Sequence, residues 1–288
     1  MAEVQKRFGV IGYPIKHSMS AFMHNAVFKE LGLPYSYKKF EVAPEKLGEF
    51  VNGEGAKLDG FNATIPHKVA LLKYMDEIDD LARLIGAVNT VKIWHEKMED
   101  GNERIRKKGF NTDAIACIRV LKENGIDAKG LRVLLLGAGG AARGIAFQLA
   151  LSGADLSIYN RTKERAEELI KEIKSKTGKE IKLIDDEKLK EEIGNSDLLI
   201  NCTSVGMHPK VDEMPIPADY LHEKLVVMDI VYNPVKTKLL KTAEEKGCKT
   251  IDGVGMLVHQ GAEALRIWLG IEPPIETMRK AVIENLRG

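Results

Sequence analysis

The chain contains 288 residues, which exceeds the usual size of a single hydrophobic core and therefore predicts two domains. Its formal net charge is +1 and 44% of its residues are hydrophobic, without a long basic run. This balance argues against nucleic acid and anionic membranes as partners, and no apolar stretch approaches the length of a membrane span. We expect a cytoplasmic protein without a signal peptide, whose three cysteines, Cys117, Cys202 and Cys248, are reduced and pack in the core.

The first part of the chain alternates segments typical of strands with segments typical of helices. Strands are expected at residues 8–12, 35–42, 60–65, 87–94 and 109–111, and helices at residues 20–31, 44–51, 68–75 and 78–85. This alternation predicts an α/β domain. Residues 95–108 are densely charged and contain Asp100-Gly101, a frequent hairpin-turn pair, so we interpret them as a solvated hairpin rather than a binding site.

Polar residues of this first part gather in four short clusters. The first cluster, residues 12–20, follows the first strand and ends at a predicted helix. Ser20 is a natural N-cap there, although hydroxyls beside a helix N-terminus also provide a hydrogen-bonding seat for a carboxylate. The second cluster, residues 62–68, lies at the carboxyl end of a strand, where the ligands of α/β sheets gather.

Three residues of the clusters have both a structural and a functional interpretation. Lys68 is predicted to open a helix, where its charge opposes the helix dipole, and this mismatch favours a functional role over that of a solvated lysine. Asn89, in the third cluster at residues 86–90, is either a turn residue or a ligand. Asp113 ends the fourth cluster, residues 109–113, at a strand-to-helix junction, where a helix N-cap is the alternative to a functional carboxylate.

A glycine-rich turn at residues 137–142 separates a strand-like run from a helical pattern. Gly137 allows a tight turn, Gly139 lets backbone N–H groups approach phosphates, and Ala142 is small enough for close helix–strand packing. This order predicts a site for a dinucleotide pyrophosphate. The alternative is a glycine turn in a structural βαβ unit, since the motif is short.

Two arginines indicate which dinucleotide binds. The strand expected at residues 156–159 ends at Asn160-Arg161-Thr162, where an NAD enzyme usually has an acid for the ribose 2′-hydroxyl. Here Arg161, followed by Arg165 one helical turn later, offers positive charge instead. The sequence therefore predicts NADP as the cofactor. Because this cofactor transfers a hydride, the other domain must hold a carbon that can be reduced or oxidised and must supply or accept one proton.

The remaining strands are expected at residues 181–184, 198–202, 226–231 and 250–251, in an alternation typical of a doubly wound parallel sheet. Beyond Gly255 the chain is helical to its end, with a break at Pro273-Pro274. We expect these last helices to return to the first domain. The predicted domains are residues 1–113 with 256–288, and residues 114–255, connected by two chain crossings at a cleft.

The ordered motifs of the whole chain resemble those of the shikimate dehydrogenase family. They are GYPIKHSMS, NATIPHK, GAVNT, NTD, GAGGAAR, NRT, NCTSVGM and GMLVHQG. The resemblance implies NADPH-linked reduction of 3-dehydroshikimate to shikimate, in the pathway to aromatic amino acids. It implies an α/β substrate domain, completed by the last helices, and a Rossmann-type doubly wound NADP domain.

The resemblance also implies the roles of individual residues. Ser18 and Ser20 would hold the substrate carboxylate, and Lys68 and Asp113 would form the catalytic pair. The substrate ring would be surrounded by Thr64, Lys68, Asn89, Asp113, Tyr232 and Gln260. The cofactor would be bound by Gly137, Ala138, Gly139, Gly140, Ala141, Asn160, Arg161, Thr162, Arg165, Thr203, Val231, Gly253 and Met256.

Several functional alternatives remain at this point. Thr203 and Tyr232 are each either cofactor or substrate contacts or residues that end and pack strands, and Met256 is otherwise a core residue. A quinate/shikimate dehydrogenase that uses NAD is disfavoured by Arg161, and a non-catalytic NADP-binding sensor is disfavoured by the presence of both Lys68 and Asp113. No metal is expected, since the histidines are scattered and hydride transfer needs none. Assembly as a homodimer is compatible with the sequence.

Overall fold

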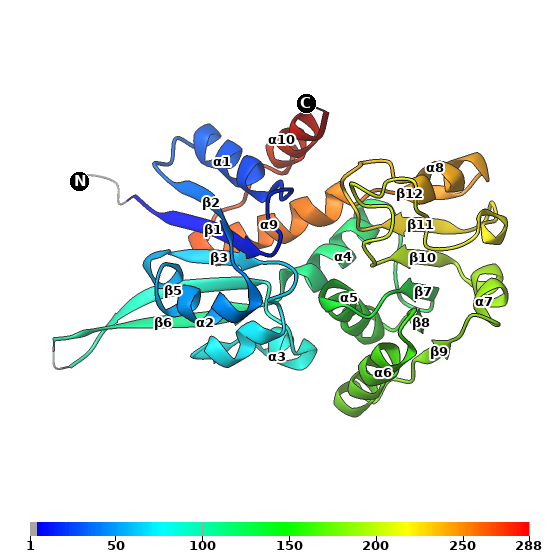
Figure 1. The fold of residues 1–288 in the computed structure, drawn as a ribbon, viewed down its shortest axis with the longest axis horizontal. Coiled ribbons are helices and arrows are strands. Elements are labelled where there is room, and N and C mark those ends of the chain that lie inside the picture. The colour runs from blue at the N-terminus through cyan, green and yellow to red at the C-terminus, as the bar shows by residue number, and fades with distance from the viewer. Residues whose placement is uncertain (1–4, 100, 288) are drawn as a thin grey trace. The chain divides into compact units, whose positions relative to one another are not determined.

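The computed structural model describes residues 5–99 and 101–287, and the chain divides into two compact units (Figure 1). One unit extends to Thr112 and resumes at Gln260, whereas the other comprises Asp113–His259. Asp100, of the predicted hairpin turn, lies outside the described residues. In the part of the chain that is described, no helix is both long enough and apolar enough to cross a membrane.

The first unit contains a mixed sheet in the order β2-β1-β3-β5-β6-β4. The strands β2, β1 and β3 are parallel, and β5 runs antiparallel to both β3 and β6. The carboxyl ends of β1 and β3 therefore lie at the same edge of the sheet. The strands are β1 (Arg7–Gly12), β2 (Ser36–Glu41), β3 (Gly60–Ala63), β4 (Glu77–Ile78), β5 (Thr90–Lys97) and β6 (Glu103–Phe110).

Alternation of side chains along these strands gives the sheet two apolar faces. On one face, Phe8 stacks on Trp268 of the returning C-terminal segment, with ring centroids 4.8 Å apart. On this unit the helices α1 (Ser20–Glu30) and α10 (Ile275–Arg287) lie side by side (Figure 1). The other face buries Ile11, Phe61 and Val91 beneath α2 (Leu47–Asn52) and the 3₁₀ turn η3 (Ala70–Tyr74).

One helix predicted for this unit is wrong in type, and another begins later than expected. Residues 68–75 form no α-helix but only the 3₁₀ turn η3, and residues 44–51 divide into the 3₁₀ turn η1 (Pro44–Lys46) and α2. The periodic apolar residues of these segments, such as Leu71 and Leu47, are buried against the sheet. A short 3₁₀ turn buries the same apolar residues that an α-helix would bury. The periodicity of these residues therefore could not distinguish a 3₁₀ turn from an α-helix.

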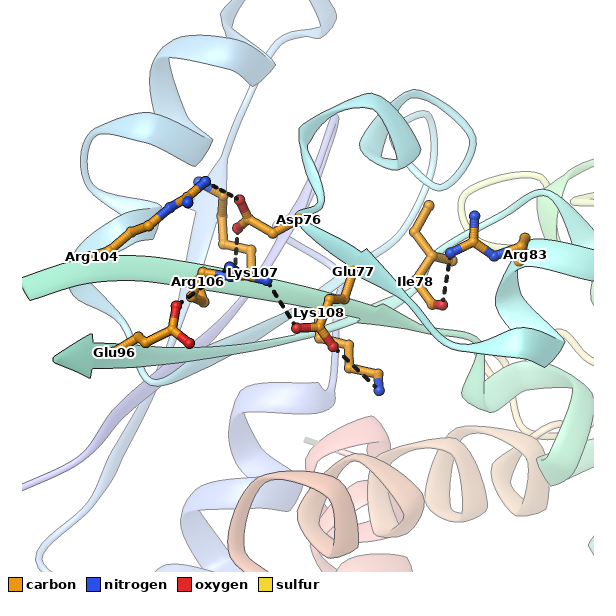
Figure 2. A network of polar contacts seen from close by, with 9 residues as sticks. All are labelled: Asp76, Glu77, Ile78, Arg83, Glu96, Arg104, Arg106, Lys107 and Lys108. Atoms are coloured by element: carbon orange, nitrogen blue, oxygen red, sulfur yellow. Dashed lines mark hydrogen bonds and ion pairs between the residues drawn. The ribbon is translucent and has the colours of Figure 1, made fainter. Parts of the chain in front are cut away.

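The charged segment 95–108 is largely strand, because β5 continues to Lys97 and β6 begins at Glu103. Long side chains there pair across the strands (Figure 2). Arg106 contacts Glu77 at 3.0 Å and Glu96 at 3.4 Å, while Lys108 lies 3.7 Å from Glu77. This surface is covered by ion pairs with partners on neighbouring strands, so the hairpin interpretation holds with longer strands than expected.

The second unit contains a wholly parallel sheet in the order β12-β11-β10-β7-β8-β9. Numbered from β7, this is the doubly wound order 3-2-1-4-5-6, which reverses direction between β7 and β10. Ligands of such sheets bind at the carboxyl ends of the strands beside this reversal. The strands are β7 (Arg132–Leu136), β8 (Asp155–Tyr159), β9 (Lys182–Ile184), β10 (Leu198–Asn201), β11 (Val226–Asp229) and β12 (Lys249–Ile251).

Helices cover this sheet with apolar side chains. A core cluster joins Leu134 and Val227 of the strands to α7 (Leu189–Asn195) and α8 (Lys238–Glu245). The other helices of the unit are α4 (Thr112–Glu123), α5 (Gly140–Leu151), α6 (Lys163–Thr177) and the first part of α9 (Val254–Leu269). Both α4 and α9 carry the chain from one unit to the other.

Candidate functional site

The predicted substrate residues of the first unit lie where β1 and β3 end. Thr64 follows β3, and its backbone N–H donates to the carbonyl of Ile11 at 2.9 Å. Gly12 lets the loops after the two strands come together, because a Cβ there would lie 2.6 Å from the Thr64 methyl. The backbone N–H of Tyr13 in turn donates to the Ile65 carbonyl at 3.0 Å. These contacts place the first two polar clusters side by side.

Ser20 is not the N-cap of α1, contrary to the sequence-based expectation. Met19 occupies that position without a side-chain hydrogen bond, and Ser20 is the first helical residue. The hydroxyl of Ser18 accepts a hydrogen bond from the Ser20 backbone N–H at 3.3 Å. The Ser20 side chain is buried, with 6% of its surface exposed.

A buried hydrogen-bond network connects the clusters from beneath. The Tyr37 hydroxyl donates to Asn62 Oδ1 at 2.8 Å, and Asn62 Nδ2 donates to Thr90 Oγ1 at 2.9 Å. The Thr90 and Thr112 hydroxyls lie 3.2 Å apart, and Asn89 Nδ2 donates to Thr112 Oγ1 at 3.0 Å. All five side chains are buried, and satisfied buried networks of this kind rigidify a site.

Lys68 is partly buried and precedes the turn η3. Contrary to the sequence-based expectation, the charge of Lys68 opposes no α-helix dipole, since residues 68–75 form no α-helix. Its position is fixed in another way, because its carbonyl accepts the Val88 backbone N–H at 2.8 Å. This bond attaches the segment around Lys68 to the third cluster, which contains Asn89.

The predicted substrate residues are divided between the two units. Ser18, Ser20, Thr64, Lys68, Asn89 and Gln260 belong to the first unit, and Asp113 and Tyr232 belong to the second. Asp113 is buried and lies in the first turn of α4, which begins one residue earlier at Thr112, so Asp113 is not a cap. Gln260 is the first residue of the segment that returns to the first unit.

The glycine turn of the second unit has the expected strand–turn–helix geometry. Gly137 has φ +111°, a conformation that favours glycine, and a Cβ there would lie 3.2 Å from the Thr203 methyl carbon and the Cys202 carbonyl oxygen. Its N–H donates to the Tyr159 carbonyl at 2.8 Å, which joins the turn to the end of β8. Gly139 is the N-cap of α5, and the first turn of that helix contains no acidic residue. Backbone N–H groups at such a helix start attract an anionic pyrophosphate.

The end of β8 presents positive charge to solvent. Arg161 and Arg165 are both exposed, and α6 begins between them at Lys163. The carboxylate of Asp186 is engaged by the Tyr159 hydroxyl at 2.6 Å, and this hydrogen bond, together with burial, raises the pKa of Tyr159 to about 12. Residues 159–162 themselves contain no acid. The arrangement fits a phosphate group better than a neutral ribose hydroxyl.

Asp229 organises the loops that follow β10 and β11. Its carboxylate accepts hydrogen bonds from Asn201 Nδ2 at 3.0 Å, from the Val231 N–H at 3.0 Å and from the Thr237 hydroxyl at 2.8 Å. Asn201 Oδ1 in turn accepts the Thr203 hydroxyl at 2.7 Å. Burial raises the pKa of Asp229 to about 6, and the hydrogen bonds oppose that effect. Predicted cofactor contacts Thr203 and Val231 are therefore held by one buried carboxylate.

The start of α9 packs tightly on the second of these loops. A Cβ at Gly253 would lie 2.5 Å from the carbonyl oxygens of Ile230 and Val231, so only glycine permits this approach. Met256 follows one turn later and is buried, with 6% of its surface exposed. The predicted cofactor residues from Gly137 to Met256 thus all belong to the second unit, at the carboxyl ends of β7, β8, β10 and β11 and at the start of α9.

A cavity of about 390 Å³ lies elsewhere, beside the amino ends of β1 and β3. Its lining includes Asp59, Lys92 and Trp268 but none of the predicted site residues. It therefore belongs to the opposite edge of the sheet from the polar clusters. Among the described residues, no group of three or more histidine, cysteine, aspartate or glutamate side chains could hold a metal ion.

Sequence reasoning missed the residues that support the site from inside. Tyr37 and Asp229 were not among the candidates, and Asn62, Thr90 and Thr112 were recognised only as members of the polar clusters. A polar residue at an inward position of an apolar strand is a usable signal for Asp229, which ends the run Val226–Asp229. No local pattern distinguishes Tyr37 from a packing residue.

The fold and the site together define a class of protein. A doubly wound parallel sheet with a glycine turn after its first strand, joined to an α/β unit that the C-terminal helices complete, is typical of two-domain dinucleotide-dependent oxidoreductases. The sequence matches three family profiles, described as Shikimate dehydrogenase substrate binding domain (residues 10–91), Shikimate / quinate 5-dehydrogenase (residues 119–245) and Shikimate 5'-dehydrogenase C-terminal domain (residues 253–283). The chain belongs to the shikimate dehydrogenase family.

Individual relatives agree over nearly the full length. A Shikimate dehydrogenase (NADP(+)) of Methanopyrus kandleri is 48% identical over 285 residues, covering 97% of this chain and 95% of the relative. A crystal structure of a shikimate dehydrogenase in complex with NADP+ is similar with a TM-score of 0.88 at 44% identity, covering 98% of this chain and 96% of the other. The enzyme of Thermus thermophilus, solved with NADP(H) and shikimate, gives 0.84 at 36% identity and coverages of 97% and 99%.

Proposed function

We propose that this chain is an NADP-dependent shikimate dehydrogenase that interconverts 3-dehydroshikimate and shikimate in aromatic biosynthesis. The observation that carries the proposal is the pairing of two sites in one chain. One is a dinucleotide site that has Arg161 and no acidic residue at positions 159–162. The other is a cluster of hydroxyl, amide and ammonium groups at the carboxyl ends of β1 and β3. Full-length similarity to shikimate dehydrogenases supports the same function.

The residues of the second unit fit NADP by their chemistry. The N–H groups at the start of α5 suit the pyrophosphate, and the exposed guanidinium groups of Arg161 and Arg165 suit the 2′-phosphate. Asn160 and Thr162 flank that position, and Thr203, Val231 and Met256 would border the reactive half of the cofactor. When bound, the nicotinamide exchanges a hydride with the substrate carbon.

The substrate site follows from the polar clusters. The hydroxyls of Ser18 and Ser20 would hold the carboxylate, whereas Thr64, Asn89, Tyr232 and Gln260 would bind the ring hydroxyls. In the reductive direction the carbonyl carbon gains a hydride and its oxygen gains a proton. Lys68 would supply that proton as an ammonium group, and the Asp113 carboxylate would keep Lys68 charged and oriented.

The function is tested by following nicotinamide absorbance with purified protein. We expect strong activity with shikimate and NADP+ and weak activity with quinate, because quinate has an extra hydroxyl on a tetrahedral carbon that must find space and a partner. Comparable catalytic efficiency with quinate and NAD+ would favour the quinate/shikimate alternative. No turnover with any of these pairs would favour a non-catalytic NADP-binding protein.

Cofactor choice is tested by Arg161→Ala. A charge-assisted hydrogen bond contributes roughly 1.5–3 kcal/mol, so loss of the guanidinium should lower kcat/KM with NADP+ by about 10- to 100-fold. The efficiency with NAD+ should change little, since NAD+ has no 2′-phosphate. Lys163→Ala, which removes a neighbouring exposed cation in the first turn of α6, is the control. An unchanged ratio of the two efficiencies in Arg161→Ala contradicts the assignment.

A further inference from the structure

The edge strand β2 binds the loop that connects β1 to α1. This loop, residues 13–19, contains Ser18 and leads to Ser20, and it is called the serine loop below. β2 is the outermost strand of the sheet, and the register places Glu41 opposite the last residue of β1, where the chain enters the serine loop. Lys39 and Glu41 are two positions apart on β2, so their side chains lie on the same face of the sheet.

Glu41 binds the middle of the serine loop. Its Oε2 accepts a hydrogen bond from the Ile15 backbone N–H at 3.3 Å. The Ile15 side chain is buried, and its carbonyl accepts the Ser18 backbone N–H at 3.0 Å. The Ser18 hydroxyl in turn accepts the Ser20 backbone N–H at 3.3 Å. A continuous series of hydrogen bonds therefore connects the Glu41 carboxylate to both serines.

Lys39 binds the next residue of the same loop. Its Nζ donates to the Lys16 carbonyl at 2.9 Å and lies over the ring of Phe22, 5.1 Å from the centroid, in the first turn of α1. An ammonium group in this position is attracted by the face of the ring. Lys39 thus connects the serine loop to the start of α1. Backbone groups of a loop need partners outside a helix or sheet ladder, and two charged side chains of β2 provide them here.

The two charges have opposite effects on a bound carboxylate. The Lys39 ammonium attracts an anionic substrate, whereas the Glu41 carboxylate repels it. Attraction of the substrate therefore cannot account for Glu41, but its hydrogen bond to the Ile15 N–H can.

We propose that Lys39 and Glu41 are positioning residues for the substrate: by binding the backbone of the serine loop, they hold the Ser18 and Ser20 hydroxyls where the substrate carboxylate binds. The inference rests on the proposed function, in which these two hydroxyls hold the carboxylate. Neither Lys39 nor Glu41 needs to touch the substrate.

Two substitutions of Glu41 separate its hydrogen bond from its charge. Glu41→Gln keeps an oxygen that accepts the Ile15 N–H, whereas Glu41→Met has none. Both variants lose the negative charge, and that loss alone would leave KM for shikimate unchanged or lower it. Loss of the hydrogen bond should instead raise this KM about 3- to 10-fold in Glu41→Met only. Because a carboxylate contact is made equally in the ground and transition states, kcat should stay within about 3-fold.

Steady-state oxidation of shikimate by NADP+ compares these variants with the wild-type enzyme. The control is Glu45→Met, at an exposed glutamate four residues later in the turn η1. We expect a raised KM for shikimate only in Glu41→Met, with KM for NADP+ unchanged in every variant. An unchanged KM for shikimate in Glu41→Met, an equal rise in Glu41→Gln or an equal rise in KM for NADP+ overturns the proposal.

Lys39→Met tests the second contact and carries the test if Glu41→Met does not fold. It should also raise KM for shikimate about 3- to 10-fold, and Lys39→Arg, which retains a donor, should stay closer to the wild type. Lys38→Met, at an exposed lysine on the opposite face of β2, is the control. Salt screens attraction between exposed charges, so a rise that disappears at high salt contradicts the proposal, as does an unchanged KM.

A double-mutant cycle tests whether Glu41 acts through the serines. In the Ser18→Ala background one of the hydroxyls that the loop presents is already absent. Adding Glu41→Met should then raise KM for shikimate by less than it does in the wild-type background. Fully additive effects contradict coupling through Ser18.

The two levels of inference fail differently. If the wild-type enzyme does not oxidise shikimate with NADP+, the proposed function is wrong. If the wild-type enzyme oxidises it and both Glu41→Met and Lys39→Met have wild-type kinetics, only the positioning role is wrong.

Discussion

Single buried polar residues hold the loops and side chains around the carboxyl ends of the strands in each of the two units. In the second unit the Asp229 carboxylate accepts three hydrogen bonds from two loops and a helix start. In the first unit the Tyr37 hydroxyl donates to Asn62 Oδ1 at 2.8 Å, and Asn62 Nδ2 donates to Thr90 Oγ1 at 2.9 Å. Asp229, Tyr37 and Asn62 are all buried, so removing any of these side chains would leave buried polar partners unsatisfied.

At the residue scale, Lys68→Met tests the proposed proton donor. Reduction of a ring carbonyl needs a proton, and positioned acid–base groups contribute on the order of 10²–10⁴ in rate. Turnover should therefore fall by at least about 100-fold, with NADP+ affinity nearly unchanged. Steady-state kinetics and NADP+ titration measure the two effects.

The companion substitution Asp113→Asn should lower turnover similarly. The double variant should be little slower than either single variant, because the two side chains are proposed to act as a unit. Near-normal turnover of Lys68→Met would mean that Lys68 is an ordinary surface lysine.

Asp229→Asn tests the buried charge. Burial raises the pKa of Asp229 from 3.8 to about 6, which means that its ionised form is disfavoured in the folded state by about 3 kcal/mol. This charge lowers the free energy of unfolding above pH 6, and the penalty disappears as pH falls toward 4, where the folded protein binds the extra proton. The asparagine is neutral at every pH. Its Oδ1 can still accept from Asn201 and Val231, and the Thr237 hydroxyl can turn to accept from its amide.

Chemical denaturation of both proteins between pH 4 and pH 8 measures this difference. We expect the variant to be more stable than the wild type near pH 7.5 and to lose that advantage as the pH approaches 4. A variant that is less stable than the wild type at pH 7.5 would show that the hydrogen bonds to the carboxylate outweigh the cost of its burial.

At the scale of the element, the β5–β6 hairpin illustrates how burial outweighs distance in an ion pair. Arg106 has a side chain that is only 22% exposed and lies between Glu77 and Glu96, at 3.0 and 3.4 Å (Figure 2). Lys46 and Glu49 are closer, at 2.8 Å, but 64% and 73% exposed. Solvent screens the second pair far more, so distance alone is a poor guide to its strength.

Arg106→Met should lower the free energy of unfolding by about 1 kcal/mol, because it retains much of the apolar stem but leaves the glutamates with weaker partners. Lys46→Met should leave it unchanged within the error of the measurement. Urea denaturation measures both values, and the Arg106 effect should shrink at high salt. Equal effects of the two substitutions would contradict the role assigned to burial. Neither substitution should alter kcat.

At the scale of the whole molecule, the C-terminal segment is part of the first unit. Trp268 Nε1 donates to the Val91 carbonyl at 2.9 Å, a bond between residues that are 177 positions apart. Met278 of α10 is fully buried, and its methyl carbon lies 3.3 Å from where a Cβ of Gly261 would be. The chain contains two tryptophans, Trp94 and Trp268, and both belong to this unit, so tryptophan fluorescence reports on its folding.

Met278→Ala should lower the unfolding midpoint observed by tryptophan fluorescence. Truncation of a buried methionine costs about 2–5 kcal/mol, which includes the cavity that remains. The control is Met98→Ala, in the same unit, where the side chain is 42% exposed. If both variants have wild-type midpoints, α10 does not contribute to the stability of this unit.

Local features of the sequence determined much of the fold and indicated many of the candidate residues. The strand–turn–helix around Gly137, the arginine at the end of the next strand and the polar clusters at strand ends each depend on short stretches of chain, in which backbone preferences and side-chain periodicity are expressed directly. The doubly wound character of the second unit followed from its alternating segments. The same local reasoning was wrong for the helix at residues 68–75 and for Ser20 as a cap, since each choice depended on contacts outside the segment.

Only the tertiary structure decided which polar atoms meet. Tyr37 reaches Asn62 because β1 lies between their strands and the register turns both side chains to one face. Asp229 reaches Asn201 because β10 and β11 are neighbours in register. Strand order and register depend on how the whole apolar surface is buried, and sequence spacing does not specify them. The sequence therefore determined the kinds of chemical groups available, while the tertiary structure decided the hydrogen bonds that hold them in place.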